Sequence, residues 1–564
     1  MPFNPTLARL SPFERLLSLF TSVRPGEGRS VCHLFVSGFL LMFAYYLLKP
    51  VREALILSEG SAELRAYVVG IVAVTLVFVI PLYNQLFRGL TDPERKSRVL
   101  RWIIAFFMTN LLMFWGLGLG GFDVGIPYFV WLSIFNVMVI AQFWAFAADL
   151  YNTRSGQRLF PVIMVGLSIG AWAGASSAGM AFDYVGPFSI MILAAALLLA
   201  PMGLSVLAER GVPDGSAAND PEEEPESAPI GFASVIGGFE VVFRSRYLLL
   251  LAGLMFLLNM INTTGEFIVA DYVKGWATAE ATRSGIAEAR LIGQVMASYY
   301  AWISLLSMLI QLFIVSRVFR HLGVRGAVLV LPIFMLAHYA ILLVLPTFFL
   351  VRWLMVSENA INYSMQNTTT QALYLPLTRE EKYVGKTTID TFFVRFGDLA
   401  QAGLVFAGLN LLGWSMGGFV VVNLVLAIGL LLIALALRRS HRTVIKEKLV
   451  NLPPEIIAPL PSVHVPSGHL LMFSVPDECF FDPDPGDVLE YSAVQTSGDA
   501  LPTWVRFDRY NQTFTVKPPR TESGGLEVEL TATDFEGLKV SGRFLVHYAP
   551  AEVPSFDPPP ATAE

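Results

Sequence analysis

Residues 31–53 read VCHLFVSGFLLMFAYYLLKPVRE, an apolar run that ends in charged side chains. A membrane-spanning helix needs ~20 mostly apolar residues, and this run has that length. It is longer than the apolar region of a secretory signal, and no small-residue cleavage site follows it. The run therefore predicts a first spanning helix that is retained. Residues 1–30 before it form either a short interfacial helix or an unstructured basic leader.

The composition of the whole chain agrees with this run. The 564 residues are 54% hydrophobic and only 15% charged, with a mean hydropathy of +0.57. Soluble domains carry ~25% charged residues, so a water-soluble enzyme is excluded and most of the protein is expected to lie in lipid. The two cysteines, Cys32 and Cys479, have no disulfide or metal-ligand spacing. We therefore expect no disulfide, no bound metal and no cofactor.

Further apolar segments of spanning length follow the first one. They lie near residues 66–87, 99–120, 126–150, 159–182, 187–207, 247–270, 292–316, 326–345, 347–370, 387–411 and 417–437. With the first, they make about twelve spans. A stretch rich in proline and glutamate, Asp214–Ala228, separates the sixth from the seventh. Six spans on each side of a linker is the layout of a transporter built from two repeats.

Lysine and arginine residues give the orientation, because they favour the cytoplasmic side. With the N-terminus inside, cytoplasmic segments collect 25 of these residues and the opposite side collects 6, Arg65 among them. Both chain ends are therefore expected in the cytoplasm, and the setting is expected to be a bacterial inner membrane.

Charged and polar side chains lie inside two of the spans, where a charge costs at least ~2.5 kcal/mol unless it has a partner. Lys49, Arg52 and Glu53 share one face of the first helix, and Asn262 and Glu266 lie on one face of the seventh. Lys49 and Glu266 lie at similar depths in the first helices of the two halves. A pseudo-twofold axis would place them opposite each other at the centre; the alternatives are interface snorkelling or a structural ion pair.

Three other spans carry ionisable residues. In 347–370, Glu358 and Asn362 belong to a polar set that predicts a cavity-lining helix. Asp149, at the end of 126–150, is either functional or a cap of the following loop. In 387–411, Asp390 precedes Arg395 and Asp398, whose spacing predicts an ion pair that is either functional or purely structural.

Several short motifs together resemble one transporter family. They are Tyr45–Glu53, Phe143–Ala147, Asn262 followed by Glu266, Gln371–Pro376 and Gly385–Asp390. In this order, over roughly residues 30–440, they are similar to the nucleotide transporter family of ATP/ADP exchangers of plastids and intracellular bacteria. That family is a distant branch of the major-facilitator architecture.

The resemblance implies one central site for an anionic nucleotide, alternating access and counter-exchange. The family's lysine and acidic residue match Lys49 and Glu266. Two departures are visible: no carboxylate stands near Leu132, and Asp398 stands where a cation is expected, with Arg395 one turn away. Because charge-assisted contacts hold phosphates, losing a cation should weaken polyphosphate binding. ATP as the substrate therefore does not follow from the resemblance.

The last part of the chain changes in pattern and charge. Residues 451–564 carry a net charge of −11, against +5 for residues 1–450, and alternating segments between Pro/Gly/Asp turns predict a small β-sandwich. Its motifs resemble the dystroglycan-type cadherin-like immunoglobulin domain, with Trp504 in the core. Such domains are usually extracellular, whereas the charge bias puts this one in the cytoplasm. Four carboxylates are explained either by calcium or by turn formation: Asp482, Asp484, Asp487 and Asp534.

The predicted fold is an all-α membrane protein of two six-helix repeats, major-facilitator-like, with a C-terminal all-β sandwich. Its parts are a cytoplasmic segment (1–30), two halves (31–207, 247–438) around a cytoplasmic linker (208–246), a second linker (439–461), the sandwich (462–550) and a disordered tail (551–564).

The predicted function is secondary active exchange of nucleotides or related phosphorylated anions. Two alternatives stay open: a proton-coupled symporter of another solute, and a scaffold or sensor that acts through its β-sandwich. The expected partners are the anion, the lipid bilayer and a protein that binds the sandwich, with no nucleic acid. Candidate substrate-binding residues are Lys49, Arg52, Asn262, Glu266, Glu358, Asn362, Asp390 and Arg395; candidate coupling or gating residues are Glu53, Asp149 and Asp398.

Overall fold

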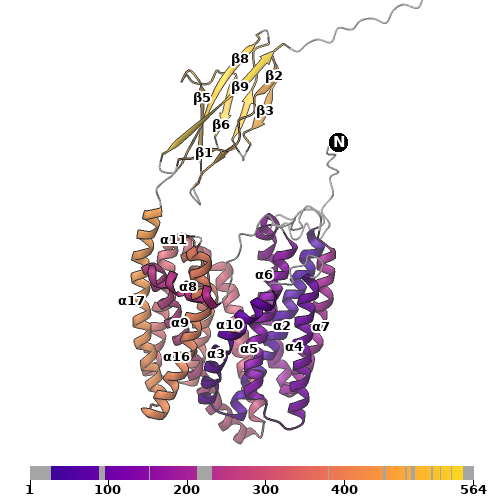
Figure 1. Ribbon diagram of the computed structural model, residues 1–564, viewed down its shortest axis with the longest axis vertical. Helices are drawn as coiled ribbons and strands as arrows, with labels where there is room; N and C mark the ends of the chain where they lie inside the picture. The colour runs from indigo at the N-terminus through magenta and orange to yellow at the C-terminus, as the bar shows by residue number, and fades with distance from the viewer. Residues whose placement is uncertain are drawn as a thin grey trace, which may run out of the picture. The chain divides into compact units, whose positions relative to one another are not determined.

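The computed structural model describes most of the chain: residues 27–87, 96–151, 153–212, 232–378, 380–448, 453–476, 479–483, 489–509, 512–520, 522–534 and 537–550. The chain divides into two compact units, Met1–His441 and Arg442–Glu564. The first is helical and the second is built of strands, as Figure 1 shows for each. Residues 1–26, the Asp214–Ala228 linker and the tail 551–564 lie outside the described residues, so the predictions for them stay predictions.

The first half of the helical unit contains six long helices (Figure 1). They are α2 (Glu27–Glu59), α3 (Ala62–Phe87), α4 (Lys96–Leu119), α5 (Gly125–Leu150), α6 (Thr153–Tyr184) and α7 (Pro187–Arg210). All six are long and apolar enough to cross a membrane. Helix α2 begins earlier than expected because Glu27 is buried and paired with Arg158 of α6 at 2.8 Å.

The second half begins with a short helix that the sequence reasoning had placed in the linker, α8 (Phe232–Arg244). The helices that follow it are α9 (Arg246–Ser284), α10 (Glu288–Phe313), α11 (Val315–Ala327), α12 (Val330–Val344), α13 (Phe348–Ile361), α14 (Asn367–Leu373), α15 (Lys386–Thr388), α16 (Val394–Phe406) and α17 (Met416–Lys448). Four π-helical turns interrupt the series: η3 (Asn362–Gln366), η4 (Glu381–Gly385), η5 (Ile389–Phe393) and η6 (Ala407–Leu411).

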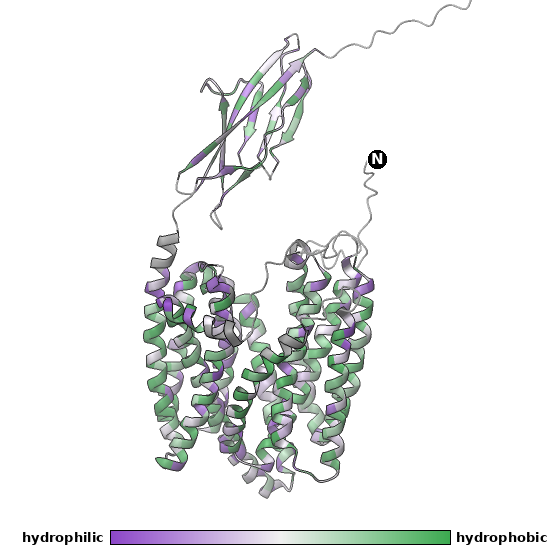
Figure 2. Ribbon diagram, viewed as in Figure 1, coloured by the Kyte–Doolittle hydropathy of each residue, from purple (hydrophilic) through white to green (hydrophobic). Residues whose placement is uncertain are grey.

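Every expected span coincides with helix, although three depart from a single straight α-helix. One of these is 387–411, which consists of α15, η5, α16 and η6. By length and hydropathy, ten described helices can cross a membrane, or eleven if α11 and α12, bent by 79°, form one span. The expected span 347–370 consists of α13, η3 and α14, so neither α-helical piece reaches spanning length alone. Figure 2 shows apolar residues dominating the helical unit. The fold class predicted from the sequence is confirmed.

Helix α6 packs directly on the backbone of α2. Gly166, Gly170 and Gly174 recur every four residues, and a Cβ on Gly170 or Gly174 would lie 2.3 Å from a backbone oxygen of α2. Small residues at this spacing let two membrane helices approach closely. The halves meet where α2 and α6 contact α10 and where α3 contacts α16. The first helices of the bundle are thereby held at the boundary between the halves.

The second unit is the predicted β-sandwich. Its strands are β1 (Glu455–Ile456), β2 (Val463–Pro466), β3 (Leu471–Ser474), β4 (Phe480–Phe481), β5 (Glu490–Gln495), β6 (Val505–Asp508), β7 (Thr513–Val516), β8 (Gly524–Thr533) and β9 (Lys539–Ala549). One sheet has the order β2-β9-β8-β5, another the order β3-β7-β6, and β1 pairs with β4. The two strands of the smallest sheet, β1 and β4, have only two residues each.

Apolar side chains from both larger sheets fill the core of this unit. Phe514 of β7 is fully buried and its ring centroid lies 5.2 Å from that of Phe544 on β9. Trp504 is partly buried against this core, with its ring 5.1 Å from Tyr548, as the core interpretation requires. The Asp534 carboxylate accepts backbone N–H groups of Gly537 and Leu538 at 2.6 and 2.8 Å. It therefore acts as a turn residue, while Asp484 and Asp487 lie outside the described residues.

Candidate functional site

Glu53, near the end of α2, is the centre of a buried charge cluster. Its carboxylate accepts hydrogen bonds from Arg52 Nε at 3.1 Å, from Arg65 Nε at 2.6 Å and from the Tyr300 hydroxyl at 3.1 Å. Glu53 is fully buried, and Arg52 and Arg65 are nearly so. A carboxylate at this depth is tolerated only when its charge and its lone pairs are satisfied. These three donors supply both the charge and the hydrogen bonds.

Arg65 also connects the two halves of the bundle. It lies in the first turn of α3, and its second terminal nitrogen contacts Glu266 of α9 at 2.9 Å. The charge count assigns Arg65 to a loop on the non-cytoplasmic side, whereas in the structure it lies within α3 and only 2% of it is exposed. Ser61 caps this helix by accepting the N–H of Leu64 at 3.1 Å. A serine followed by a helical stretch is the signal that could have placed Arg65 inside α3.

Lys49 lies one helical turn from this cluster and has a different environment. Its ammonium lies 4.0 Å from the ring centroid of Tyr300 and 5.3 Å from that of Tyr46. Among the residues that the structure describes, it forms no ion pair. Lys49 and Glu266 form no ion pair with each other among the described residues. Glu266 pairs with Arg65 instead, and Tyr300, whose ring lies beside Lys49, donates its hydroxyl hydrogen bond to Glu53.

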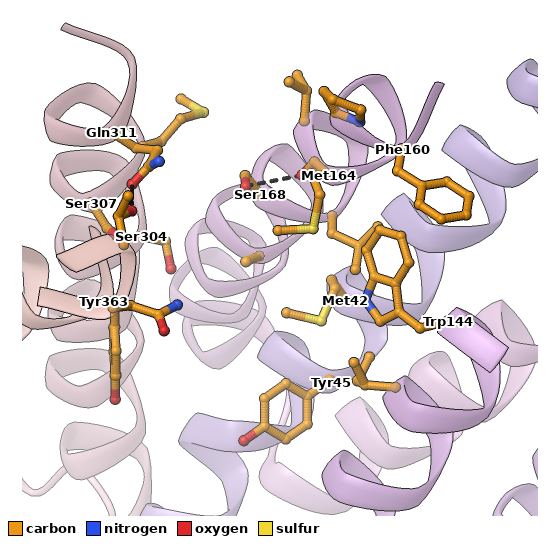
Figure 3. A pocket seen from close by; sticks show the side chains of 18 of the residues that line it. Met42, Tyr45, Trp144, Phe160, Met164, Ser168, Ser304, Ser307, Gln311 and Tyr363 are labelled. Atoms are coloured by element: carbon orange, nitrogen blue, oxygen red, sulfur yellow. Dashed lines mark hydrogen bonds between the residues drawn. The ribbon is translucent and has the colours of Figure 1, made fainter. Parts of the chain in front are cut away.

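A cavity of about 1440 Å³ lies beside Lys49. Figure 3 shows Met42, Tyr45, Trp144 and Met164 of the first half on one side of it, and Ser304, Ser307, Gln311 and Tyr363 of the second half on the other. The walls are mostly aromatic, aliphatic, amide and hydroxyl side chains. Lys49 is the one charged residue in the described lining.

The cavity extends from Lys49 to the ends of α5 and α14. Its lining includes Tyr151, directly after α5, Gly156, in the first turn of α6, and Gln371 of α14. Burial raises the pKa of Tyr151 to about 12, and its hydroxyl donates to Ser30 Oγ at 2.8 Å. It therefore contributes no charge near neutral pH. The Glu53 cluster lies beyond Lys49, toward the end of α2, and is not part of the lining.

The pair expected in the eleventh span is present. Arg395 Nη1 contacts Asp398 at 2.9 Å, and Asn259 of α9 donates to the same carboxylate at 2.6 Å. Asp398 is buried and is fully engaged by these two donors. This geometry agrees with a structural role for the Arg395–Asp398 pair, one of the two alternatives that the sequence leaves open.

A second buried pair was found only in the structure. His338 of α12 and Glu358 of α13 are both fully buried, and His338 Nδ1 contacts Glu358. The adjacent Asn359 donates to the Tyr299 hydroxyl at 3.2 Å. Two atoms of the pair, His338 Nε2 and Glu358 Oε1, have no hydrogen-bond partner in the described part of the chain. A lone histidine in an apolar helix gave no signal of this partner in the sequence.

The remaining candidates are separate from these clusters. Asn262 is buried on α9, Asn362 is half-buried at the start of η3, and Asp390 and Asp149 are exposed. None of them belongs to the described cavity lining, and neither does Glu358. Among the described residues, no group of His, Cys, Asp and Glu has metal-binding geometry.

Comparisons with known proteins agree with this architecture. Residues 453–549 match the family described as a putative Ig domain. A mutant of the nucleoside transporter NupG shares the fold with a TM-score of 0.51 at 11% identity, covering 74% of this chain and 99% of that one. A bacterial homologue of the iron transporter ferroportin, in an inward-facing state, gives a TM-score of 0.50 at 12% identity, with coverages of 73% and 98%.

A helical bundle of this fold, with ten or eleven helices among the described residues that can cross a membrane, is the architecture of a multi-pass integral membrane protein. The chain is also similar in sequence to two named transport proteins. ADP,ATP carrier protein 1 of Chlamydia pneumoniae is 23% identical over 321 residues, which are 50% of this chain and 59% of that protein. Its counterpart in Chlamydia muridarum is 21% identical over 470 residues, covering 70% and 85%. The resemblance stated from the motifs is confirmed.

Proposed function

We propose that this chain exchanges nucleotides or related phosphorylated anions across a bacterial inner membrane by alternating access. The observation that carries the proposal is Lys49, a buried cation without a carboxylate partner among the described residues, on the wall of a cavity between the two halves. An unpaired ammonium at membrane depth is costly and is stabilised when an anionic cargo binds. The relatives named ADP,ATP carriers support a nucleotide as that anion.

In this proposal, the Glu53 cluster holds the two halves together on one side of the cavity during part of the transport cycle. The contact from Arg65 to Glu266 joins α3 of the first half to α9 of the second. Opening the cavity on that side requires this pair to separate, because a bundle alternates access by moving one half against the other. The side on which the cavity reaches the ends of α5 and α14 is expected to face the cytoplasm.

Uptake into proteoliposomes tests the proposal. The full chain is reconstituted, and labelled ATP, ADP, AMP and NAD are offered with and without unlabelled nucleotide inside. We expect uptake that is stimulated several-fold by internal nucleotide and that persists after the proton gradient is dissipated. Uptake of none of them, with liposomes shown to contain folded protein, contradicts the proposal.

Proton-coupled symport is the second candidate, and the His338–Glu358 pair favours it. Buried histidine and carboxylate side chains inside membrane helices often belong to proton pathways. Under this candidate an ionophore that removes the proton gradient abolishes concentrative uptake, and the variant Glu358→Gln uncouples uptake from the gradient. The same uptake assay therefore separates the two candidates.

A further inference from the structure

Lys49 on the cavity wall and the adjoining Glu53 cluster form a small set of buried charges, called the charge inventory below. The cations are Lys49, Arg52 and Arg65, and the carboxylates are Glu53 and Glu266. Both arginines contact carboxylates and Lys49 does not, so the group has one uncompensated positive charge. Rearranging the pairs during transport leaves this net charge unchanged as long as all five residues stay in the interior.

The other charged residues buried in the spans do not add to this inventory. Arg395 and Asp398 neutralise each other at 2.9 Å. His338 and Glu358 form their own pair away from the described lining. The other polar side chains in the described lining are neutral, among them Tyr45, Tyr46 and Tyr363. A cargo in this cavity therefore meets one positive charge.

The number of charges on a buried ligand must match that of its site, because each unpaired charge in a low-dielectric interior is costly. We propose that the transported substrate carries a single net negative charge and a bulky aromatic or polar body. The cavity of about 1440 Å³ exceeds the common ligand pocket of ~300–1,000 Å³ and leaves room for such a body. Tyrosine rings beside Lys49 offer surfaces on which a planar base can stack.

This inference rests on the proposed function and narrows it. A nucleoside triphosphate would bring three negative charges that the inventory leaves without partners. A nucleotide diester with one charge would be balanced by Lys49 alone. The proposal therefore separates this chain from a carrier of highly charged polyphosphates, while keeping nucleotide transport itself.

A binding series that changes only the charge tests the inference. The purified full chain in nanodiscs is titrated with adenosine, cyclic AMP, AMP, ADP and ATP, at a pH where they carry zero, one, two, three and four negative charges. We expect cyclic AMP to bind at least about tenfold more tightly than adenosine and than ATP. The variant Lys49→Gln should reduce cyclic AMP to the affinity of adenosine, and Lys49→Arg should restore most of the difference.

A second variant is expected to change which ligand binds most tightly, so that the test does not depend only on a loss of binding. Glu266→Gln raises the net charge of the inventory by one, so the optimum should move from cyclic AMP to AMP, with AMP gaining about tenfold. The matched control is Glu280→Gln, which removes a carboxylate from the same helix where it pairs with exposed Arg283 at 2.9 Å. This control should leave the order of affinities unchanged.

The outcomes are distinguishable. Tightest binding of ADP or ATP by the wild-type chain overturns the inference but leaves nucleotide transport standing. An unchanged order in Glu266→Gln, with the protein folded, also overturns it. Absence of binding and exchange for the whole series overturns the proposed function itself.

Discussion

At the scale of single residues, Arg65 is the side chain on which the closed arrangement depends. It satisfies both oxygens of buried Glu53, Oε2 at 2.6 Å and Oε1 at 3.4 Å, and reaches Glu266 at 2.9 Å. Replacing a whole buried charge network by apolar residues often changes stability little. Removing one member is different, because it leaves the charges of the others without a partner. Arg65 therefore matters through the two carboxylates that it neutralises.

Replacing Arg65 should be strongly destabilising. We expect Arg65→Gln to lower the free energy of unfolding by about 3–5 kcal/mol, because Glu53 and Glu266 lose their shared cation. Thermal denaturation in detergent, followed by size-exclusion chromatography, measures the loss. The control Arg283→Gln, whose side chain is 80% exposed, should change the midpoint little. Restoration of stability by adding Glu266→Gln would confirm the pairing, and equal stability of Arg65→Gln and wild type would contradict it.

At the scale of elements, the contact of α6 with α2 shows how the first half is assembled. Positions 166, 170 and 174 lie on one face of α6, each opposite a phenylalanine carbonyl of α2. The apolar stripe that predicts a spanning helix does not say which face meets a neighbour. The glycine spacing contains that information.

A side chain at this contact should force the helices apart. We expect Gly170→Val to cost about 1–3 kcal/mol, since its Cβ would overlap the Phe39 carbonyl. The matched control is Gly203→Val on α7, where the space is open and only the propensity change remains. Comparison of the two thermal midpoints isolates the packing effect. Equal midpoints for both variants would mean that α6 and α2 are not in close contact.

At the scale of the whole molecule, the chain consists of two units with separate cores. The sandwich has its own buried cluster around Phe514, Val528 and Val546. A domain with its own core and a family match over residues 453–549 can fold alone. Its role as a docking module for a protein partner stays a prediction.

Independent folding of the sandwich has a direct measurement. We expect the fragment 453–550, produced alone, to be monomeric, rich in β-structure by circular dichroism and cooperative in thermal unfolding. The helical unit ending near residue 448 should keep ligand binding. A fragment without cooperative unfolding would show that the sandwich depends on the membrane unit.

The orientation of the chain is a second prediction at this scale. The charge count places Lys49, Arg52 and Arg65 on the outer side, and all three are buried. Fewer exposed lysine and arginine residues therefore remain on that side than the count assumes. In a cysteine-free background, Ala217→Cys in the linker should react with an impermeant maleimide only after the cytoplasmic face is exposed. Ile286→Cys, in the turn between α9 and α10, should react from the opposite face. The reverse pattern would invert the topology.

The sequence by itself determined the membrane character, the two six-helix halves and the β-sandwich, and it predicted Lys49, Glu53 and Glu266 as candidate site residues. These follow from local composition, because a charge inside an apolar span stands out wherever the span is placed. Only the tertiary structure decided the partners: Arg65 for Glu53 and Glu266, His338 for Glu358, and a tyrosine ring for Lys49. Each of these contacts joins residues on different helices, and no spacing along one helix encodes such a distance.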